Sequence, residues 1–174
     1  MIVAEKQTPA PNTNMRIGEI AIVGPDLKTK KSFINAVCDD VIVETENLIF
    51  GRLQINDELV IHLYGVDLSE KELNPSWDLV SRKLLGYIVL FNWSNPNSLA
   101  DVTSTVDLLA ARYDIPLVIA ANLKNSQTSV PRELLNAEIN LTRQGQFTFC
   151  KLSDPKSVKN VLITLINSVL DNLN

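Results

Sequence analysis

Short, nearly continuous apolar runs recur along the chain, and each has the length of a buried β-strand. The second and third runs are joined only by Asn56 and Asp57, a pair typical of a tight hairpin turn. The sequence therefore predicts an early hairpin within a larger set of buried strands. The runs are Glu19–Gly24, Leu48–Ile55, Glu58–Val66, Gly86–Trp93, Pro116–Leu123 and Gln146–Ser153.

Near the C-terminus, apolar residues recur every three or four positions, which is the period of a helix packed on one side. This segment begins with Asp154, a good helix cap, and Pro155, which is favoured at the first helical position. We expect the helix to pack on the sheet, with a membrane or a partner helix as the alternative. Its stripe consists of Val158, Val161, Leu162, Leu165, Ile166, Val169, Leu170 and Leu173.

Other segments with helical spacing lie between the predicted strands. A short helix is expected at Lys30–Val37, and further helices near Trp77–Leu85 and at Pro131–Ile139. Asn95 can cap another helix, which Pro96 begins. The core-facing positions of the first and last of these helices are Phe33, Ile34 and Val37, and Leu99, Val102, Val106, Leu109 and Tyr113.

Strands and helices thus alternate after the hairpin, and fully apolar strands predict a mostly parallel sheet with helices on both faces. Ligands bind such sheets at the carboxyl ends of the strands, where Gly24, Asn122 and Ser153 are expected. Residues 17–174 form one predicted domain. Residues 1–16 are rich in Pro, Thr and Asn and predict a disordered tail.

Composition limits the functions that the chain can have. The net charge of −4, without a basic stripe, argues against nucleic acid. No apolar run approaches the ~20 residues of a membrane span, and the N-terminus lacks a signal peptide, so we expect a cytoplasmic protein. His62 is the only histidine, which excludes multi-histidine metal sites. Cys38 and Cys150 fit no metal spacing and are expected to be free, buried thiols.

Four phrases in order, "IVGPDLKTKKSF", "FGRLQINDELVIHLYG", "GYIVLFNWSNPNSL" and "PLVIAANLKN", resemble the Ras-like small GTPases. The closest resemblance is to bacterial small GTPases of the signal-recognition-particle-receptor-β and gliding-protein (Mgl) type, over about residues 17–173. It implies a three-layer P-loop NTPase (small GTPase-like) α/β fold. Such a fold has a mostly parallel six-stranded sheet with one antiparallel edge strand, and it holds GTP or GDP with Mg²⁺.

The phosphate loop of this family reads G-x-x-x-x-G-K-[ST] and curls backbone N–H groups around phosphate. Gly24 matches the first glycine and Lys30 matches the lysine. Thr29 replaces the second glycine, and its side chain crowds the phosphate. Lys31 replaces the hydroxyl that holds Mg²⁺, and Ser32 comes one residue late. The resemblance therefore implies a damaged phosphate loop.

Three lysines, at positions 28, 30 and 31, lie at the predicted start of a helix, where an anion is welcome. Two interpretations stay open: a working triphosphate cradle or a solvated basic turn. If a phosphate binds, its candidate ligands are Gly24, Lys28, Thr29, Lys30, Lys31 and Ser32.

The loop after the third predicted strand lacks the groups that the family uses for hydrolysis. Leu68 takes the place of the glycine that senses the γ-phosphate, and Ser69 that of the glutamine that orients water. Asp67 could hold a metal or be a solvated turn residue. Thr45 could close over Mg²⁺ or be an ordinary loop threonine. We assign neither a catalytic residue nor a metal site.

The base-reading motif N-K-x-D is reduced to "NLKN". Asn125 replaces the aspartate that accepts two guanine protons, and Leu123 replaces the lysine that lies along the base. The candidate base-binding residues are Asn122, Lys124, Asn125 and Ser153, with a structural role in turns and caps as the alternative.

The core pattern is complete while the nucleotide motifs are damaged, so the first hypothesis is a pseudo-GTPase. Such a protein would not hydrolyse GTP and need not bind a nucleotide. It would act as a regulatory or scaffold protein. The resemblance implies protein partners, including Roadblock-type proteins. The second hypothesis is a divergent GTPase that binds GTP or another nucleotide weakly through Lys30, with Ser32 or Thr45 helping to hold Mg²⁺, and hydrolyses it only with a partner. A receiver-type domain ranks third, because only Asp26 follows the first strand.

Overall fold

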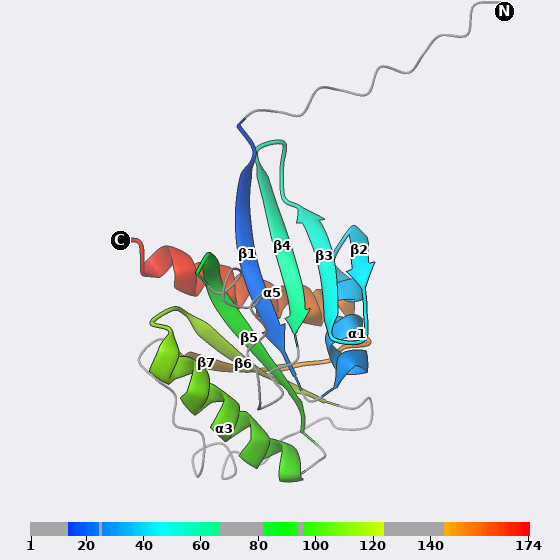
Figure 1. The fold of residues 1–174 in the computed structure, drawn as a ribbon, viewed down its shortest axis with the longest axis vertical. Helices are drawn as coiled ribbons and strands as arrows, with labels where there is room; N and C mark the ends of the chain where they lie inside the picture. The colour runs from blue at the N-terminus through cyan, green and yellow to red at the C-terminus, as the bar shows by residue number, and fades with distance from the viewer. Residues whose placement is uncertain (1–13, 25, 67–81, 94–95, 124–144) are drawn as a thin grey trace, which may run out of the picture.

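The computed structural model describes residues 14–24, 26–66, 82–93, 96–123 and 145–174 (Figure 1). Side chains are described for these residues except 96–101. Strands and helices follow in the order β1 (Arg16–Val23), α1 (Leu27–Val37), β2 (Asp40–Glu44), β3 (Leu48–Gln54), β4 (Leu59–Val66), β5 (Leu84–Asn92), α3 (Pro96–Arg112), β6 (Leu117–Asn122), β7 (Gly145–Cys150) and α5 (Pro155–Asp171).

The strands form one seven-stranded sheet in the order β2-β3-β4-β1-β5-β6-β7. β4, β1, β5, β6 and β7 run parallel, while β3 is antiparallel to both of its neighbours. The expected mostly parallel sheet is confirmed. The expectation of six strands with the antiparallel one at the edge is wrong, because β2 adds an outer strand beside β3. An antiparallel hairpin of this kind also departs from the all-parallel order of a receiver-type domain.

The predicted hairpin is confirmed and is held by its own turn. β3 pairs with β4 from Leu48 opposite Val66 to Gln54 opposite Val60. At the turn, Asn56 Oδ1 accepts hydrogen bonds from the backbone N–H groups of residues 58 and 59, at 2.9 and 2.8 Å. An asparagine that bonds the backbone two and three residues ahead fixes a turn locally, which explains why the sequence signal was reliable.

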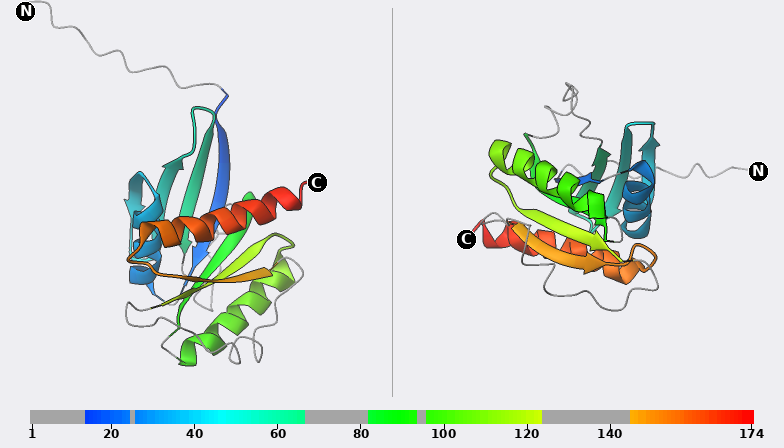
Figure 2. Two further views of the ribbon diagram at one scale, coloured as in Figure 1. Left: turned by 180° about the vertical axis from the view of Figure 1, so that it is seen from behind. Right: turned by 90° about the horizontal axis from the view of Figure 1, so that it is seen from below.

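Helices cover both faces of the sheet (Figure 2). On one face, α1 and α5 cover a core that includes Phe33, Ile34 and Val37, as predicted. On the other face, α3 covers a second core through Val102, Val106 and Leu109. The core of the domain is therefore split into two apolar layers by the sheet, which is the arrangement expected for strands that are buried on both sides.

The C-terminal helix confirms its sequence signals. Asp154 Oδ1 accepts a hydrogen bond from Lys156 N at 3.0 Å, and Pro155 is the first helical residue. Gly86 of β5 lets the helix approach closely, because a Cβ there would lie 2.8 Å from Leu165 Cδ1. Leu170 and Leu173, the last residues of the predicted stripe, are exposed. The buried part of the stripe is Val158, Val161, Leu162 and Leu165.

Several predicted boundaries shift. α1 begins at Leu27, three residues before the expected start, as its bounds show. The last two residues expected in the helix near Trp77–Leu85 belong to β5, and residues 77–81 lie outside the described ones. The predicted helix at Pro131–Ile139 and the cap Asn95 also lie outside them. Of the predicted tail, residues 14–16 are described, and Arg16 already belongs to β1.

No helix within the described residues is long and apolar enough to cross a membrane.

Candidate functional site

The candidate residues lie where the parallel strands end. Gly24 directly follows β1, Asn122 is the last residue of β6, and Ser153 lies between β7 and α5. The sheet order places β5 between β1 and β6, with β7 beyond β6. The sequence-predicted phosphate and base residues therefore lie along the same edge of the sheet, as the fold rule for parallel strands requires.

The connection between β1 and α1 is short. Only residues 24–26 separate Val23, the last strand residue, from Leu27, the first helical residue. The helix therefore begins inside the motif, so Thr29, which stands in the place of the second glycine, already lies in the first helical turn. The described residues contain no positive φ angle, so none adopts the left-handed backbone that a glycine-rich loop uses.

Asp26 caps α1 in extended conformation, with φ −148° and ψ 162°. Its Oδ1 accepts a hydrogen bond from the backbone N–H of Thr29 at 2.6 Å. Helix N-terminal N–H groups are the donors that bind phosphate in other proteins. Here a carboxylate of the same chain already occupies one of these donors, and it carries the negative charge that the helix end favours.

Lys30 is almost completely buried, with 2% of its surface exposed. Its Nζ donates a hydrogen bond to the backbone carbonyl of Val66, the last residue of β4, at 2.9 Å. Two glycines make room for its stem: a Cβ on Gly24 would lie 3.3 Å from Lys30 Cγ, and one on Gly65 would lie 3.3 Å from Lys30 Cβ. Lys30 thus connects the start of α1 to the end of β4.

Two of the remaining polar residues of the motif, Lys31 and Ser32, bind within the protein. Lys31 Nζ forms an ion pair with Glu44 Oε1 of β2 at 2.5 Å. Ser32 Oγ donates to the carbonyl of Lys28 at 2.9 Å, one turn earlier in the same helix. Lys28 is exposed. The lysines therefore do not converge on one point: one lies inside, one reaches the sheet edge, and one is in solvent.

Thr45, the candidate switch threonine, belongs to the turn between β2 and β3. Its Oγ1 donates to Leu48 O at 3.3 Å and accepts from Leu48 N at 3.1 Å. A threonine hydroxyl that bonds its own turn in this way has a structural role. Asp67, Leu68 and Ser69 lie outside the described residues. Within those described, no group of three or more His, Cys, Asp or Glu side chains could hold a metal ion.

Asn122 joins the ends of three strands. Its Nδ2 donates to Asn92 Oδ1 at the end of β5, at 3.1 Å. Its Oδ1 accepts from Leu152 N, beyond β7, also at 3.1 Å. Both polar atoms of the Asn122 amide are therefore engaged inside the protein. Ser153 is exposed, and Lys124 and Asn125 lie outside the described residues.

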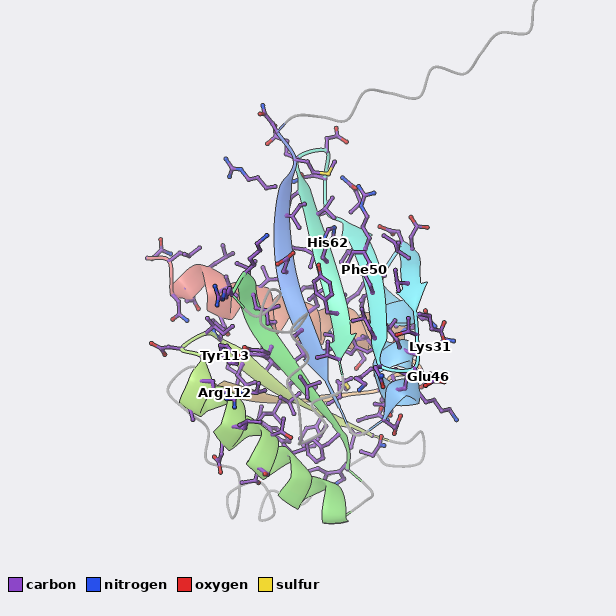
Figure 3. The ribbon with its side chains drawn as sticks, in the orientation of Figure 1. Lys31, Glu46, Phe50, His62, Arg112 and Tyr113 are labelled. Carbon is purple, nitrogen blue, oxygen red and sulfur yellow. The ribbon has the colours of Figure 1, made fainter. Side chains whose placement is uncertain are left out.

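A polar and aromatic cluster on the sheet face was not predicted as a group (Figure 3). The ring of Phe50 lies 4.9 Å from that of His62 and 5.0 Å from that of Tyr64. Tyr64 OH donates to Glu19 Oε1 at 3.2 Å. His62, the only histidine of the chain, packs edge-on against Phe50. Only the strand register, which pairs Glu19 with His62, could have revealed the cluster.

Burial governs the ionisation of this cluster. Burial lowers the pKa of His62, with Glu19 opposing the shift and Arg52 adding to it. Burial, followed by the charge and hydrogen bond of Glu19, raises the pKa of Tyr64 to about 12. Glu19 Oε2 is buried and has no hydrogen-bond partner among the described residues. The cluster contains one carboxylate, and its histidine is held toward the neutral form.

Both cysteines are free thiols, as expected. Cys150 is buried, whereas Cys38 is only partly buried, so the expectation of burial is wrong for Cys38. Cys38 ends α1 as its C-terminal cap, and its N–H donates to Ile34 O. Burial raises the pKa of each thiol to about 12, and the nearby charge of Asp39 adds to the shift at Cys38. Neither cysteine has the lowered pKa of a catalytic thiol.

No protein-family model matches the chain, and no curated protein sequence matches it significantly.

Proposed function

We propose that this protein is a pseudo-GTPase: a small-GTPase-like domain that does not hydrolyse GTP and acts as a regulatory or scaffold protein in the cytoplasm. The observation that carries the proposal is the filled N-terminus of α1. Asp26 accepts the Thr29 N–H, and Lys30 is buried against the carbonyl of Val66. The two groups that a phosphate would contact are thus satisfied by the protein's own oxygen atoms.

A triphosphate would have to displace both interactions. Losing an aspartate cap costs about 0.5–2 kcal/mol, and the displaced Asp26 carboxylate would remain beside the phosphate as a like charge. The short connection at residues 24–26 supplies few free N–H groups in return. These costs support weak or absent nucleotide binding without requiring any other part of the chain to block the site.

The base side supports the same proposal. Asn122 is the one residue retained from N-K-x-D, and its amide bonds Asn92 and the backbone of Leu152. This clamp holds strand ends together whether or not a nucleotide is present. Its retention in the sequence therefore has a structural explanation that does not require a bound base.

Titration with fluorescent GTP, ATP and XTP, with and without Mg²⁺, tests the proposal. We expect no Mg²⁺-dependent binding in the submicromolar range. Asp26→Asn is the informative variant, because it keeps a capping oxygen and removes the negative charge at the helix end. It should bind inorganic phosphate and GTP more tightly than the wild type. Asp154→Asn, which makes the same change at α5, is the matched control.

A divergent GTPase is the second candidate, and the position of Lys30 favours it. Lys30 packs beside Gly24 at the start of α1, next to the first strand, which is where the resemblance places a phosphate-binding lysine. On this hypothesis GTP or GDP with Mg²⁺ is the cofactor and a partner supplies catalytic groups. Submicromolar, Mg²⁺-dependent binding that is lost in a folded Lys30→Met variant would establish this candidate and reject the pseudo-GTPase.

From the resemblance we also propose a class of partner, the Roadblock-type proteins. Co-purification with such a protein, followed by gel filtration of the mixture, tests that assignment. A stable complex without added nucleotide is the result that the scaffold proposal predicts.

A further inference from the structure

Glu19, His62 and Arg52 lie in one row across three neighbouring strands of the sheet. The register pairs His62 of β4 with Glu19 of β1 on one side and with Arg52 of β3 on the other. Side chains at paired positions of adjacent strands stand on the same face, close enough to interact. The only histidine of the chain therefore lies between an acidic and a basic neighbour.

The carboxyl group of Glu19 is bonded through one of its two oxygen atoms. Its Oε1 accepts a hydrogen bond from the Tyr64 hydroxyl at 3.2 Å. Its Oε2 is buried and has no hydrogen-bond partner in the part of the chain that the structure describes. A buried carboxylate oxygen without a hydrogen bond is costly, so an additional donor beside Glu19 would be favoured.

His62 can gain such a donor by taking up a proton. A neutral imidazole has one N–H group and an imidazolium ion has two, so protonation adds a donor and a positive charge together. Glu19, at the paired position on β1, is the carboxylate that this charge would attract. The Tyr64 hydroxyl and a protonated His62 are therefore competing donors for the same carboxylate.

Opposing influences set the proton affinity of His62. Burial lowers its pKa from the ordinary value of 6.5, the charge of Glu19 opposes this shift and the charge of Arg52 adds to it. The other titratable group beside His62 within the described residues is Tyr64, which keeps its proton at neutral pH because its pKa is raised to about 12. His62 is therefore mainly neutral at neutral pH and becomes protonated below pH 6.5.

We propose that His62, Tyr64 and Glu19 form a pH-sensitive switch on this face of the sheet. At neutral pH Glu19 accepts the hydrogen bond of Tyr64, which is the arrangement in the structure. On acidification His62 takes a proton from solvent and donates a ring N–H to the Glu19 carboxylate, and the Tyr64 hydroxyl is released. One hydrogen bond replaces another, and the only atom gained is the solvent proton on the imidazole.

The pH-sensitive switch would change both charge and packing at this face. An imidazolium ion would add one positive charge beside Arg52. Phe50 would respond as well, because its ring lies 4.9 Å from that of His62 and 5.0 Å from that of Tyr64. The inference goes beyond the proposed function and does not depend on it, since none of these side chains is a candidate phosphate or base ligand.

An NMR titration of the protein, purified without a histidine tag, tests the inference, because a single histidine gives a single imidazole signal. We expect His62 to titrate below pH 6.5, and the ring signals of Tyr64 to shift with the same midpoint. Tyr64→Phe removes the competing hydroxyl and keeps the ring that stacks on Phe50. In this variant Glu19 is free for His62, so the pKa of His62 should rise by about 0.5–1.

Two further variants identify the partners of the exchange. Glu19→Gln removes the attracting charge, so the pKa of His62 should fall below its wild-type value. His62→Gln should abolish the shift of the Tyr64 signals over the same pH range. Tyr113→Phe is the matched control, because it removes a tyrosine hydroxyl just after α3, away from His62 (Figure 3). It should leave the midpoint of His62 unchanged.

The inference is overturned if Tyr64→Phe leaves the midpoint of His62 unchanged, or if Tyr113→Phe moves it as far. It is also overturned if the Tyr64 signals do not follow His62 in the wild type, or still respond to pH in the same way in His62→Gln. All of these titrations are made without nucleotide. Tight GTP binding would therefore reject the pseudo-GTPase while leaving the test of His62 as it stands.

Discussion

The N-termini of α1 and α5 are both capped by an aspartate side chain, but only α1 has a buried lysine in its first turn. Asp26 accepts from Thr29 N at 2.6 Å, and Asp154 accepts from Lys156 N at 3.0 Å. At α5 the next residue is an exposed proline, and the cap completes the helix end. At α1 a buried lysine follows the cap four residues later.

The difference shows how groups of the same chain can occupy a helix N-terminus that would otherwise favour an anion. α1 combines a carboxylate on its N–H groups, a buried ammonium on Val66 O and an ion pair to the sheet edge through Lys31. α5 has the carboxylate alone among these three. An aspartate at a helix start therefore says little about function until the nearby cations are located.

The largest expected effect comes from removing the buried lysine. Lys30→Ala should lower the free energy of unfolding by about 2–3 kcal/mol, because it removes a packed stem and leaves the Val66 carbonyl without its bond. Lys156→Ala, at the exposed start of α5, should change it by less than about 0.5 kcal/mol. Urea unfolding measures both. Equal effects at the two positions would remove the distinction between the helix ends.

Removing each cap should have an intermediate effect. Asp26→Ala and Asp154→Ala should each cost about 1 kcal/mol of stability, since each loses one capping bond. Thermal unfolding at low salt measures the cost. Added phosphate should restore more stability to Asp26→Ala than to Asp154→Ala, because Lys28, Lys30 and Lys31 closely follow the first cap, whereas Lys156 is the one lysine in the first turn after the second. Equal rescue of Asp154→Ala would contradict that expectation.

The two thiols sharpen the comparison, because Cys38 ends α1 and Cys150 ends the strand that leads to α5. Cys38, which is partly exposed, should react with iodoacetamide about tenfold faster than buried Cys150. Peptide mass spectrometry measures both rates.

Because both pKa values are raised from 9.0 to about 12, the folded state holds these protons more tightly. Stability contributed by the thiols is therefore present below pH 9 and declines as the pH rises toward 12. Cys38→Ser with Cys150→Ala should flatten that decline in urea unfolding. An unchanged pH profile would show that neither thiol contributes.

The smallest expected effect is that of the ion pair between Lys31 and Glu44. Both side chains are more than one third exposed, at 42% and 45%. Solvent screens such pairs, so a double-mutant cycle with alanine should give a coupling of about 0–0.5 kcal/mol. The coupling should fall further in high salt. A coupling above about 1 kcal/mol would mean that the pair, and not Lys30, fixes the start of α1.

The parts of the fold that the sequence predicted carry local signals. Asp154 and Pro155 predict the start of α5, and Asn56 predicts the hairpin turn, because each of them contacts or constrains only residues close to it in the sequence. β2 was missed because all five of its residues are exposed, so no buried apolar pattern marks it. The early start of α1 had a local signal, the aspartate three residues before Thr29, which the phosphate-loop resemblance obscured.

The candidate site depended on contacts that no local pattern contains. Lys30 bonds Val66, 36 residues away, and Asn122 bonds Asn92, 30 residues away. The sequence identified these residues as the retained ones of damaged motifs. It could not show that their polar atoms are satisfied within the protein, because that depends on which strand ends meet at the sheet edge.

The most direct test follows the Thr29 amide by NMR while GTP and Mg²⁺ are added to about 1 mM. A dissociation constant of that size corresponds to a binding free energy of only about 4 kcal/mol, so even weak binding would be detected. We expect that the Thr29 resonance does not move, because Asp26 keeps its bond to that N–H. A saturable, Mg²⁺-dependent shift of Thr29 together with the Lys30 side-chain signal would show phosphate among these groups and contradict the central claim.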